Sequence, residues 1–485
     1  MRTLALLLLF LPSFALAQSD PAAPGAPDIA TVPNPRPQGE SFWDRFWLSV
    51  QANFIRQQNP SFPAKYSGTN SFQPEAGHAT SRVETLYTGF QITPHFEIIA
   101  DVESAGGAGL SQALGIAGFT NVDVVRNPTL SESPYFSRML LHFTVPLSEE
   151  STDATRNPLS LAWTLPVRRL EIHAGKMSTV DFFDLNSVGS DSHLQFMNWA
   201  IVNNGAYDYA ADTRGYTFGI VAEYFDRNWA FRFGEMLMPT TANGIDVDWN
   251  IARARAENFE LEYRPVWLPK RSTVVRGLAF VNHANMGSYR EAIAGYLSGK
   301  DAVPDVTLYR KQGTVKYGFG LNVEQELTDL WRAFGRLGWN DGRTETYAYT
   351  EIDRTVQFGT DFRGKPWHRS DDKLGAAYVS NGLSADHTRY LALGGLGFIL
   401  GDGALNYGTE RIFETYYTAQ IWRGISCAFD YQHVSNPATT GTAVLWTCSA
   451  FASTSRKPFR SSRKSSYSLK IETSTTGISE FRSRG

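Results

Sequence analysis

Polar and aromatic side chains are concentrated in one stretch of the chain, residues 181–216. This stretch combines carboxylates and amides that accept hydrogen bonds, an arginine that donates them, and flat aromatic rings. The candidates are Asp181, Asp184, Asn198, Trp199, Tyr207, Asp208, Tyr209, Asp212 and Arg214. Such a mixture could hold a polar solute with weakly apolar faces. A purely structural role stays open, in which these residues brace a loop and the aspartates cap turns.

A second group of charged residues recurs at alternate positions of short segments. Its members are Arg169, Glu171, Arg232, Glu260, Glu262, Arg332 and Arg336. Two interpretations remain open for them. They could line a water-filled interior and tune its selectivity, or they could simply belong to a solvated wall.

The elements that would position these residues are recognised by strict alternation. In residues 47–54, Leu48, Val50 and Phe54 alternate with the polar Ser49 and Asn53, and the same period recurs at 95–103, 169–175, 259–264 and 412–421. A period of two predicts β-strands with two different environments on their faces. A soluble sandwich would also show it. Full charges on the polar face and aromatics at the ends of the apolar face favour a transmembrane barrel instead.

Length and composition agree with an all-β outer-membrane barrel. Aromatic residues make up 13% of the chain, the net charge is -3 and the mean hydropathy is -0.27. The charge gives no reason to expect nucleic acid as a partner. At about 9 to 11 residues per membrane strand, the chain fits about 16 to 18 antiparallel strands, a size that leaves an aqueous channel.

The N-terminal region predicts export. Residues 1–17 resemble a signal peptide, with Arg2, an apolar run over 4–11 and a small-residue cleavage site ending at Ala17. Residues 18–41 are rich in proline and predict a flexible periplasmic leader. The barrel is expected over 42–437.

Several motifs, in order along the chain, resemble the carbohydrate-selective porins of the OprB family. They include YSGTNS at 66–71 followed by TLYTG at 85–89, the stretch GLS to GIAGF at 109–119, and a block running from GK at 175 through DFFDLN, QFMNWA and GAYDY to DTRGY at 216. Further matches lie at 316–322, 338–342, 381–384, 414–417 and 430–432. The resemblance covers roughly residues 45–437.

This resemblance implies a 16-stranded barrel with inward-folding loops in the outer membrane of a Gram-negative bacterium, through which glucose-like mono- and disaccharides diffuse passively. It implies no catalytic residue, no cofactor and no energy coupling at the barrel itself, and the residues themselves give no reason to expect a metal. The partners expected are small sugars together with outer-membrane lipid and lipopolysaccharide, and both a homotrimer and a monomer remain open. Within 181–216, Trp199 and Tyr207 would stack on sugar faces while Asp208 and Arg214 would bind hydroxyls.

Three other classes of protein could share some of these features. A general small-solute porin would share the fold without the selectivity. A phospholipase-type barrel would need a serine and a histidine in contact, and no local signature marks such a pair among the nine histidines. A soluble periplasmic sugar-binding β-protein would also suit the aromatic content.

The sequence changes character after Pro437. Residues 438–485 are rich in Ser, Thr, Lys and Arg, and no alternating strand is apparent where the family has its final strand. A one-base frameshift directly after Ala438 would restore the continuation Tyr-Asn-Arg-Asp-Arg-Gly-Pro-Val-Asp, which resembles the family's. The alternative is a divergent tail. Either way, this sequence predicts a barrel that closes incompletely, because unpaired strand edges in lipid are costly.

Overall fold

The computed structural model describes residues 42–64, 67–123, 130–422, 424–440 and 444–458. The predicted signal peptide, leader and distal tail (1–17, 18–41 and 459–485) lie outside the described residues. For 444–458 the description covers the backbone only.

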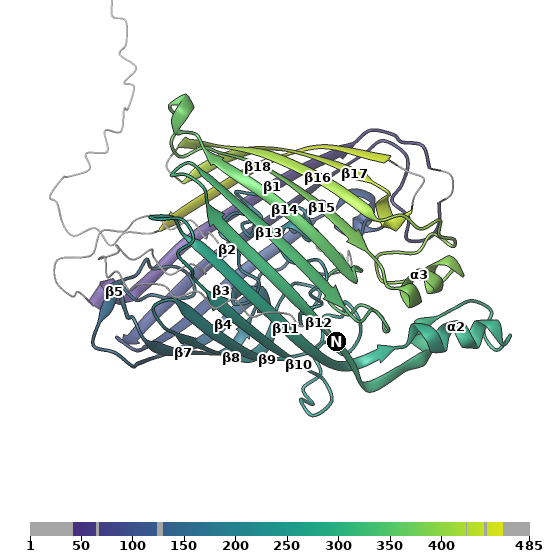
Figure 1. Ribbon diagram of the computed structural model, residues 1–485, viewed down its shortest axis with the longest axis horizontal. Coiled ribbons are helices and arrows are strands. Elements are labelled where there is room, and N and C mark those ends of the chain that lie inside the picture. Colours follow the sequence, from purple (N-terminus) through teal and green to yellow (C-terminus); the bar gives the residue numbers. More distant parts are fainter. Residues whose placement is uncertain (1–41, 65–66, 124–129, 423, 441–443, 459–485) are drawn as a thin grey trace, which may run out of the picture.

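The described chain forms a closed barrel in which sixteen strands pair antiparallel with their neighbours (Figure 1). The strands are β1 (Phe46–Asn59), β2 (Gly77–Thr93), β3 (Phe96–Gly107), β4 (Tyr135–Pro146), β7 (Arg169–Met177), β8 (Thr217–Phe225), β9 (Trp229–Leu237), β10 (Arg255–Tyr263), β11 (Thr273–Gly287), β12 (Arg310–Glu326), β13 (Trp331–Asn340), β14 (Arg354–Arg363), β15 (Lys373–Gly382), β16 (Glu410–Trp422), β17 (Ile425–Ser435) and β18 (Val444–Pro458). The all-β barrel expected from the alternation is confirmed.

The two faces of the strands have opposite character, as the period of two predicts. In β1, Leu48, Val50 and Phe54 point outward and are exposed, whereas Gln51 and Asn53 point inward and are buried. An apolar outer face and a polar inner face are the arrangement of a membrane barrel. A soluble sandwich would place the apolar face inside.

The remaining elements are short. β5 (Ser151–Asp153) and β6 (Thr164–Pro166) form a separate hairpin between β4 and β7. The helices are α1 (Trp199–Val202), α2 (Tyr289–Leu297) and α3 (Ala385–Ala392), with 3-10 turns η1 (Phe42–Arg45), η2 (Leu110–Ala113), η3 (Thr179–Asp181), η4 (Val306–Tyr309), η5 (Lys365–Trp367) and η6 (Pro437–Thr439). In the described part of the chain no helix has the length and apolarity that crossing a membrane requires.

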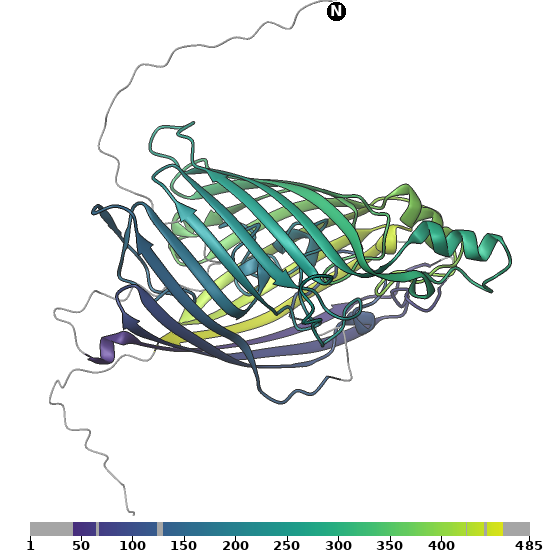
Figure 2. The same ribbon diagram turned by 90° about the horizontal axis from the view of Figure 1, so that it is seen from below.

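The two ends of the barrel differ in their connections. Short turns join β2 to β3, β8 to β9, β12 to β13 and β16 to β17 at one end, which we name the short-turn end. Long segments join β3 to β4, β7 to β8 and β15 to β16 at the other, the long-loop end. Helices α2 and α3 project at the long-loop end, opposite β5 (Figures 1 and 2).

The barrel closes through β18, and this corrects the expectation that no strand follows Pro437. β18 pairs antiparallel with β17 on one side and with β1 on the other. Ladder hydrogen bonds are made by the backbone, so a segment without clear alternation can still satisfy both edges. The frameshift concerns the nucleotide sequence and stays a hypothesis.

The interior of the barrel is filled by the long loops. Its largest buried cluster contains loop residues such as Phe119, Phe183, Phe196 and Ile201, packed against wall residues such as Phe280. The prediction of inward-folding loops is therefore confirmed. Whatever passes through the barrel must pass beside these loops.

Candidate channel constriction

Residues 178–216 connect β7 to β8 and form the main inward loop, which we name the constriction loop. Its shape is set locally by capping. Ser178 and Asp181 form a reciprocal capping box around η3, and the Asn198 side chain accepts a hydrogen bond of 3.0 Å from the Ala200 amide at the start of α1. Asp184 has a φ of 58°, a left-handed conformation that aspartate tolerates.

Carboxylates of the barrel wall hold one side of the constriction loop by its backbone amides. Glu260 on β10 accepts from the Asp184 amide at 2.8 Å. Glu324 on β12 accepts from the Ser187 amide at 2.9 Å, and Glu414 on β16 accepts from the Met197 amide at 2.7 Å. A charged acceptor strengthens such bonds. The loop is thus fixed to the β10–β16 wall.

Asp208 belongs to this fixed side. Its carboxylate lies 3.1 Å from Nζ of Lys316 on β12 and accepts from the amides of Tyr347 at 3.0 Å and Ala348 at 2.9 Å. Asp208 and Lys316 are both buried. The Asp208 carboxylate therefore joins the constriction loop to β12 and to the segment between β13 and β14.

Asp184 is held similarly. Its Oδ1 lies 3.2 Å from Nε of Arg336 on β13, and its Oδ2 accepts from the Asn204 amide at 2.6 Å. Burial of the carboxylate raises the pKa of Asp184 despite the neighbouring guanidinium. Nη1 of Arg336 also donates to the Ile201 carbonyl at 2.8 Å, so this pair fixes two points of the loop.

The charged residues predicted on the polar strand faces do point inward, and each of them forms an ion pair with a neighbouring side chain. Arg232 contacts Glu223 at 2.8 Å, Glu260 at 2.9 Å and Glu262 at 3.0 Å. The others pair as Arg169 with Glu171, Arg276 with Glu262 and Glu324, Arg332 with Asp361, and Arg336 with Asp184. None of the candidates Arg169, Glu171, Arg232, Glu260, Glu262, Arg332 and Arg336 is among the residues that line the cavity described next.

A cavity of about 270 Å³ lies on the opposite side of the constriction loop, against the wall of β1 to β4. Of the residues singled out in the sequence, Asp181, Trp199, Tyr209, Asp212 and Arg214 line it. Asp184, Asn198, Tyr207 and Asp208 do not, because they face the fixed side or the loop interior. The side-chain amide of Asn198 donates a hydrogen bond of 2.8 Å to the Gly118 carbonyl. The Tyr207 hydroxyl donates one of 2.7 Å to Oδ1 of Asn258.

Charges of both signs meet in this cavity. Arg138 on β4 donates to both oxygens of Asp181, at 2.7 and 2.6 Å. The Arg214 guanidinium lies over the Tyr135 ring at 3.9 Å from its centre. Asp212 accepts from the Arg214 amide at 2.8 Å, and burial raises the pKa of its carboxyl group. The cavity lining therefore offers both hydrogen-bond donors and acceptors.

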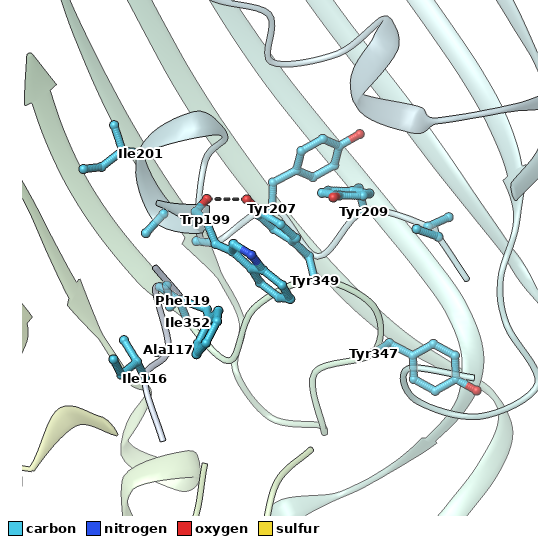
Figure 3. Close-up of a cluster of buried hydrophobic side chains, with 14 of the residues drawn as sticks. Ile116, Ala117, Phe119, Trp199, Ile201, Tyr207, Tyr209, Tyr347, Tyr349 and Ile352 are labelled. Atoms are coloured by element: carbon cyan, nitrogen blue, oxygen red, sulfur yellow. Dashed lines mark hydrogen bonds between the residues drawn. The ribbon is translucent and has the colours of Figure 1, made fainter. Parts of the chain in front are cut away.

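Aromatic rings form another part of the cavity lining. Trp199 and Tyr349 are stacked with ring centres 5.5 Å apart and planes 8° apart, and Tyr209 packs on Tyr349 at 4.7 Å. The Tyr349 hydroxyl donates to the Trp199 carbonyl (Figure 3). The aromatic surface is thus made by Trp199, Tyr209 and Tyr349, whereas Tyr207 packs against Phe280 and lies outside it.

Sequence analysis missed the cavity residues that come from outside residues 181–216. The missed polar and aromatic residues include Glu103, Tyr135, Arg138 and Tyr349. Glu103 accepts from the hydroxyls of Thr85 at 3.0 Å and Tyr216 at 2.9 Å. Alternation in 95–103 did place Glu103 on a polar strand face. No local pattern indicated that the cavity would lie against β1 to β4 and not against another part of the wall.

The profile described as "Carbohydrate-selective porin, OprB family" matches residues 79–457, a range that extends through most of β18. The fold is similar to OprB of Pseudomonas putida at high pH, with a TM-score of 0.65 and 12% identity over 85% of this chain and 94% of that one. The outer membrane channel DcaP of Acinetobacter baumannii gives a TM-score of 0.44 and 9% identity over 85% and 96%. No curated protein matches the chain in sequence.

A closed barrel with an apolar outer face and a loop-narrowed interior defines the class of outer-membrane porins. With a profile match over most of its length, this chain belongs to the OprB family of carbohydrate-selective porins. It is a sugar porin of the Gram-negative outer membrane and a channel rather than an enzyme. The alternatives of a phospholipase-type barrel and a soluble periplasmic protein are therefore set aside. Porin barrels place short turns in the periplasm and long loops outside, which orients the two ends.

Proposed function

We propose that this porin passes glucose-like mono- and disaccharides by passive diffusion, and that they cross beside the constriction loop through the cavity against β1 to β4. The observation that carries the proposal is the lining of that cavity. It joins the Arg138–Asp181 pair and the Asp212–Arg214 turn to the aromatic group of Trp199, Tyr209 and Tyr349.

The chemistry of this lining suits a neutral sugar. Sugar hydroxyls both donate and accept, so arginine donors and aspartate acceptors can each be used. Opposite charges side by side bind hydroxyls without imposing a strong preference for cations or anions. The aromatic rings offer flat apolar surfaces for the C–H faces of a pyranose. Within the constriction loop we assign hydroxyl binding to Asp181, Asp212 and Arg214, and stacking to Trp199 and Tyr209.

Passage needs no energy input at the barrel. Porins of this size conduct down a gradient through an aqueous path. Concentration difference and capture of sugar in the periplasm would set the direction of flux. The lumen charges on the fixed side are paired and would act chiefly by holding the loop.

Liposome swelling tests this assignment. Purified porin is reconstituted, and swelling rates are compared for glucose and for an uncharged polyol of similar size. Alanine variants of Asp181, Trp199, Asp212 and Arg214 should lower the glucose rate relative to the polyol. If no variant changes that ratio, the cavity does not select sugars, and the chain conducts as a general small-solute porin.

A further inference from the structure

A row of polar residues crosses the part of the barrel wall that borders the cavity. Gln51 on β1 pairs with Thr85 on β2, and Thr85 pairs with Glu103 on β3. Glu103 in turn pairs with Tyr135 on β4. Residues that are directly paired on neighbouring antiparallel strands share a face of the sheet, and all of these residues line the cavity. We name them the wall row.

Glu103 is the centre of a group of hydroxyl donors. Its Oε2 accepts hydrogen bonds from the hydroxyls of Thr85 at 3.0 Å and Tyr216 at 2.9 Å. Its Oε1 accepts from the Tyr135 hydroxyl. A carboxylate has no hydrogen of its own, so none of these hydrogen bonds can run in the opposite direction. The hydroxyl hydrogens of Thr85, Tyr135 and Tyr216 are therefore all directed at Glu103.

The direction of these hydrogen bonds decides what the hydroxyls offer to a solute. A hydroxyl group carries one hydrogen and two lone pairs. Once the hydrogen is bound to Glu103, the hydroxyl oxygen can only accept from a further partner. These oxygens are therefore fixed as acceptors, although serine, threonine and tyrosine hydroxyls can in general take either role.

The Tyr216 hydroxyl extends this arrangement from the wall to the constriction loop. Tyr216 is the last residue of that loop and lines the cavity together with Tyr135. The two rings lie edge to face, with centres 6.5 Å apart. Because Glu103 binds both hydroxyls, one carboxylate orients acceptors on two borders of the cavity.

We propose that Glu103 determines the specificity of the channel by fixing the hydroxyls of Thr85, Tyr135 and Tyr216 as acceptors. Glu103 is a positioning residue, because it acts through these hydroxyls. A solute that donates from several hydroxyls, as a sugar does, is favoured over a solute of equal size that has fewer donors. The inference rests on the proposed function, since it requires that sugars cross through this cavity.

Monofluorinated sugars test this role of Glu103. Replacing one sugar hydroxyl with fluorine removes a hydrogen-bond donor and changes the size of the sugar little. Folded porin is inserted into a planar bilayer, and block of its ion current is titrated with glucose and with monofluorinated glucoses that each lack one hydroxyl. In the wild type at least one analogue should need an about three- to tenfold higher concentration for half-maximal block, which corresponds to the loss of one hydrogen bond.

Glu103→Gln is the decisive variant, because Asp181 and Asp212 can also accept from a sugar. Glutamine keeps the shape of the side chain, but its amide group must donate to at least one of the hydroxyl oxygens, and that hydroxyl can then turn its hydrogen to the cavity. The ratio between analogue and glucose should fall to less than about twofold. A merely structural role would weaken the binding of glucose and analogue alike and would leave this ratio unchanged.

Two further variants support the comparison. Tyr216→Phe deletes one of the oriented acceptors and should lower the ratio in part. Glu84→Gln is the matched control and should keep the wild-type ratio. Glu84 is a half-exposed carboxylate on β2 that pairs with Arg82 at 3.0 Å and does not line the cavity. Heat-modifiable gel mobility verifies that each variant is folded.

Failure of the role of Glu103 can be told from failure of sugar passage. If glucose does not block the wild-type current, the cavity binds no sugar, and both proposals are overturned. If glucose blocks but fluorination has no effect in the wild type, or has the same effect in Glu103→Gln as in Glu84→Gln, only the role of Glu103 is overturned. Should Glu103→Gln fail to fold, an unchanged ratio in Tyr216→Phe overturns it instead.

Discussion

The constriction loop has two sides, and they are built on different principles. Toward β10–β16, carboxylates of the wall accept hydrogen bonds from backbone amides of the loop, and buried charges are paired with each other, as in Asp208–Lys316. Toward β1–β4, the Arg138–Asp181 pair, Asp212 and Arg214 line the cavity, and although the first three side chains are also largely buried, each borders that space on one side. A charge packed against protein on all sides needs full pairing, whereas a charge that borders a cavity can exchange a partner for a solute hydroxyl. The first side therefore fixes the loop, and the second side is where solute contacts are expected.

The largest effect should come from the fixed side. Asp208→Ala leaves the Lys316 ammonium buried without its partner, which costs about 3–5 kcal/mol of unfolding free energy. The unfolding midpoint followed by heat-modifiable mobility should fall clearly, and single-channel conductance should rise as the loop loosens.

A second substitution controls the first. Asp208→Ala with Lys316→Met removes both charges and should recover part of the lost stability. Recovery would be incomplete because the amides of Tyr347 and Ala348 also lose their acceptor. If Asp208→Ala alone is as stable as the wild type, Asp208 does not brace the loop.

The open side should respond in transport rather than in stability. Arg214→Ala should lower the glucose swelling rate several-fold relative to the polyol, with less than about 1 kcal/mol change in stability, since the side chain is half-buried and contacts the Tyr135 ring and the Ser131 carbonyl. Arg253→Ala serves as the control, because Arg253 is an exposed arginine paired with Asp248 at 3.2 Å, away from the cavity. If Arg214→Ala and Arg253→Ala change glucose transport equally, the cavity side of the loop has no special role in transport.

A smaller effect is expected from pH. Because the pKa of Asp212 is raised, its carboxyl group takes up a proton at a higher pH than an ordinary aspartate as the solution is acidified. The cavity then loses a negative charge, so cation selectivity should fall. Reversal potentials in a salt gradient, measured from neutral to acidic pH, should show this shift in the wild type. In Asp212→Asn that component should be absent.

The smallest effect is expected from the aromatic surface. Trp199→Phe keeps a ring in the lining but loses area and the hydrogen bond from Nε1 to the Asn121 carbonyl at 2.7 Å. Glucose swelling should drop modestly, while Tyr207→Phe, outside the cavity, should leave it unchanged. A larger transport effect at Tyr207 than at Trp199 would restore the stacking pair first expected from the sequence.

The barrel itself could be predicted because alternation is local. Each strand carries its own signal, and Leu48, Val50 and Phe54 reveal the outward face without reference to the rest of the chain. β18 escaped prediction because its pairing depends on two neighbouring edges rather than on its own pattern. Closure was therefore underestimated.

The candidate site could be predicted only by segment. Residues 181–216 do form the inward loop, but the sequence does not say which side of that loop meets open space. Asp208 and Asp212 have the same residue type and lie four positions apart, yet one is buried against Lys316 and the other borders the cavity. Their difference comes from contacts with strands and loops distant in the sequence, and no local pattern records these contacts.

One measurement tests the central claim most directly. In a background with Cys427→Ser and Cys448→Ser, a single cysteine is introduced as Thr85→Cys on β2, which lines the cavity, or as Thr355→Cys on β14, which lies under the fixed side of the loop. A bulky thiol reagent is added during single-channel recording. We predict that labelling blocks most of the current, and slows glucose entry, only for Thr85→Cys. Block at Thr355→Cys without block at Thr85→Cys would show that the solute path lies on the other side of the loop.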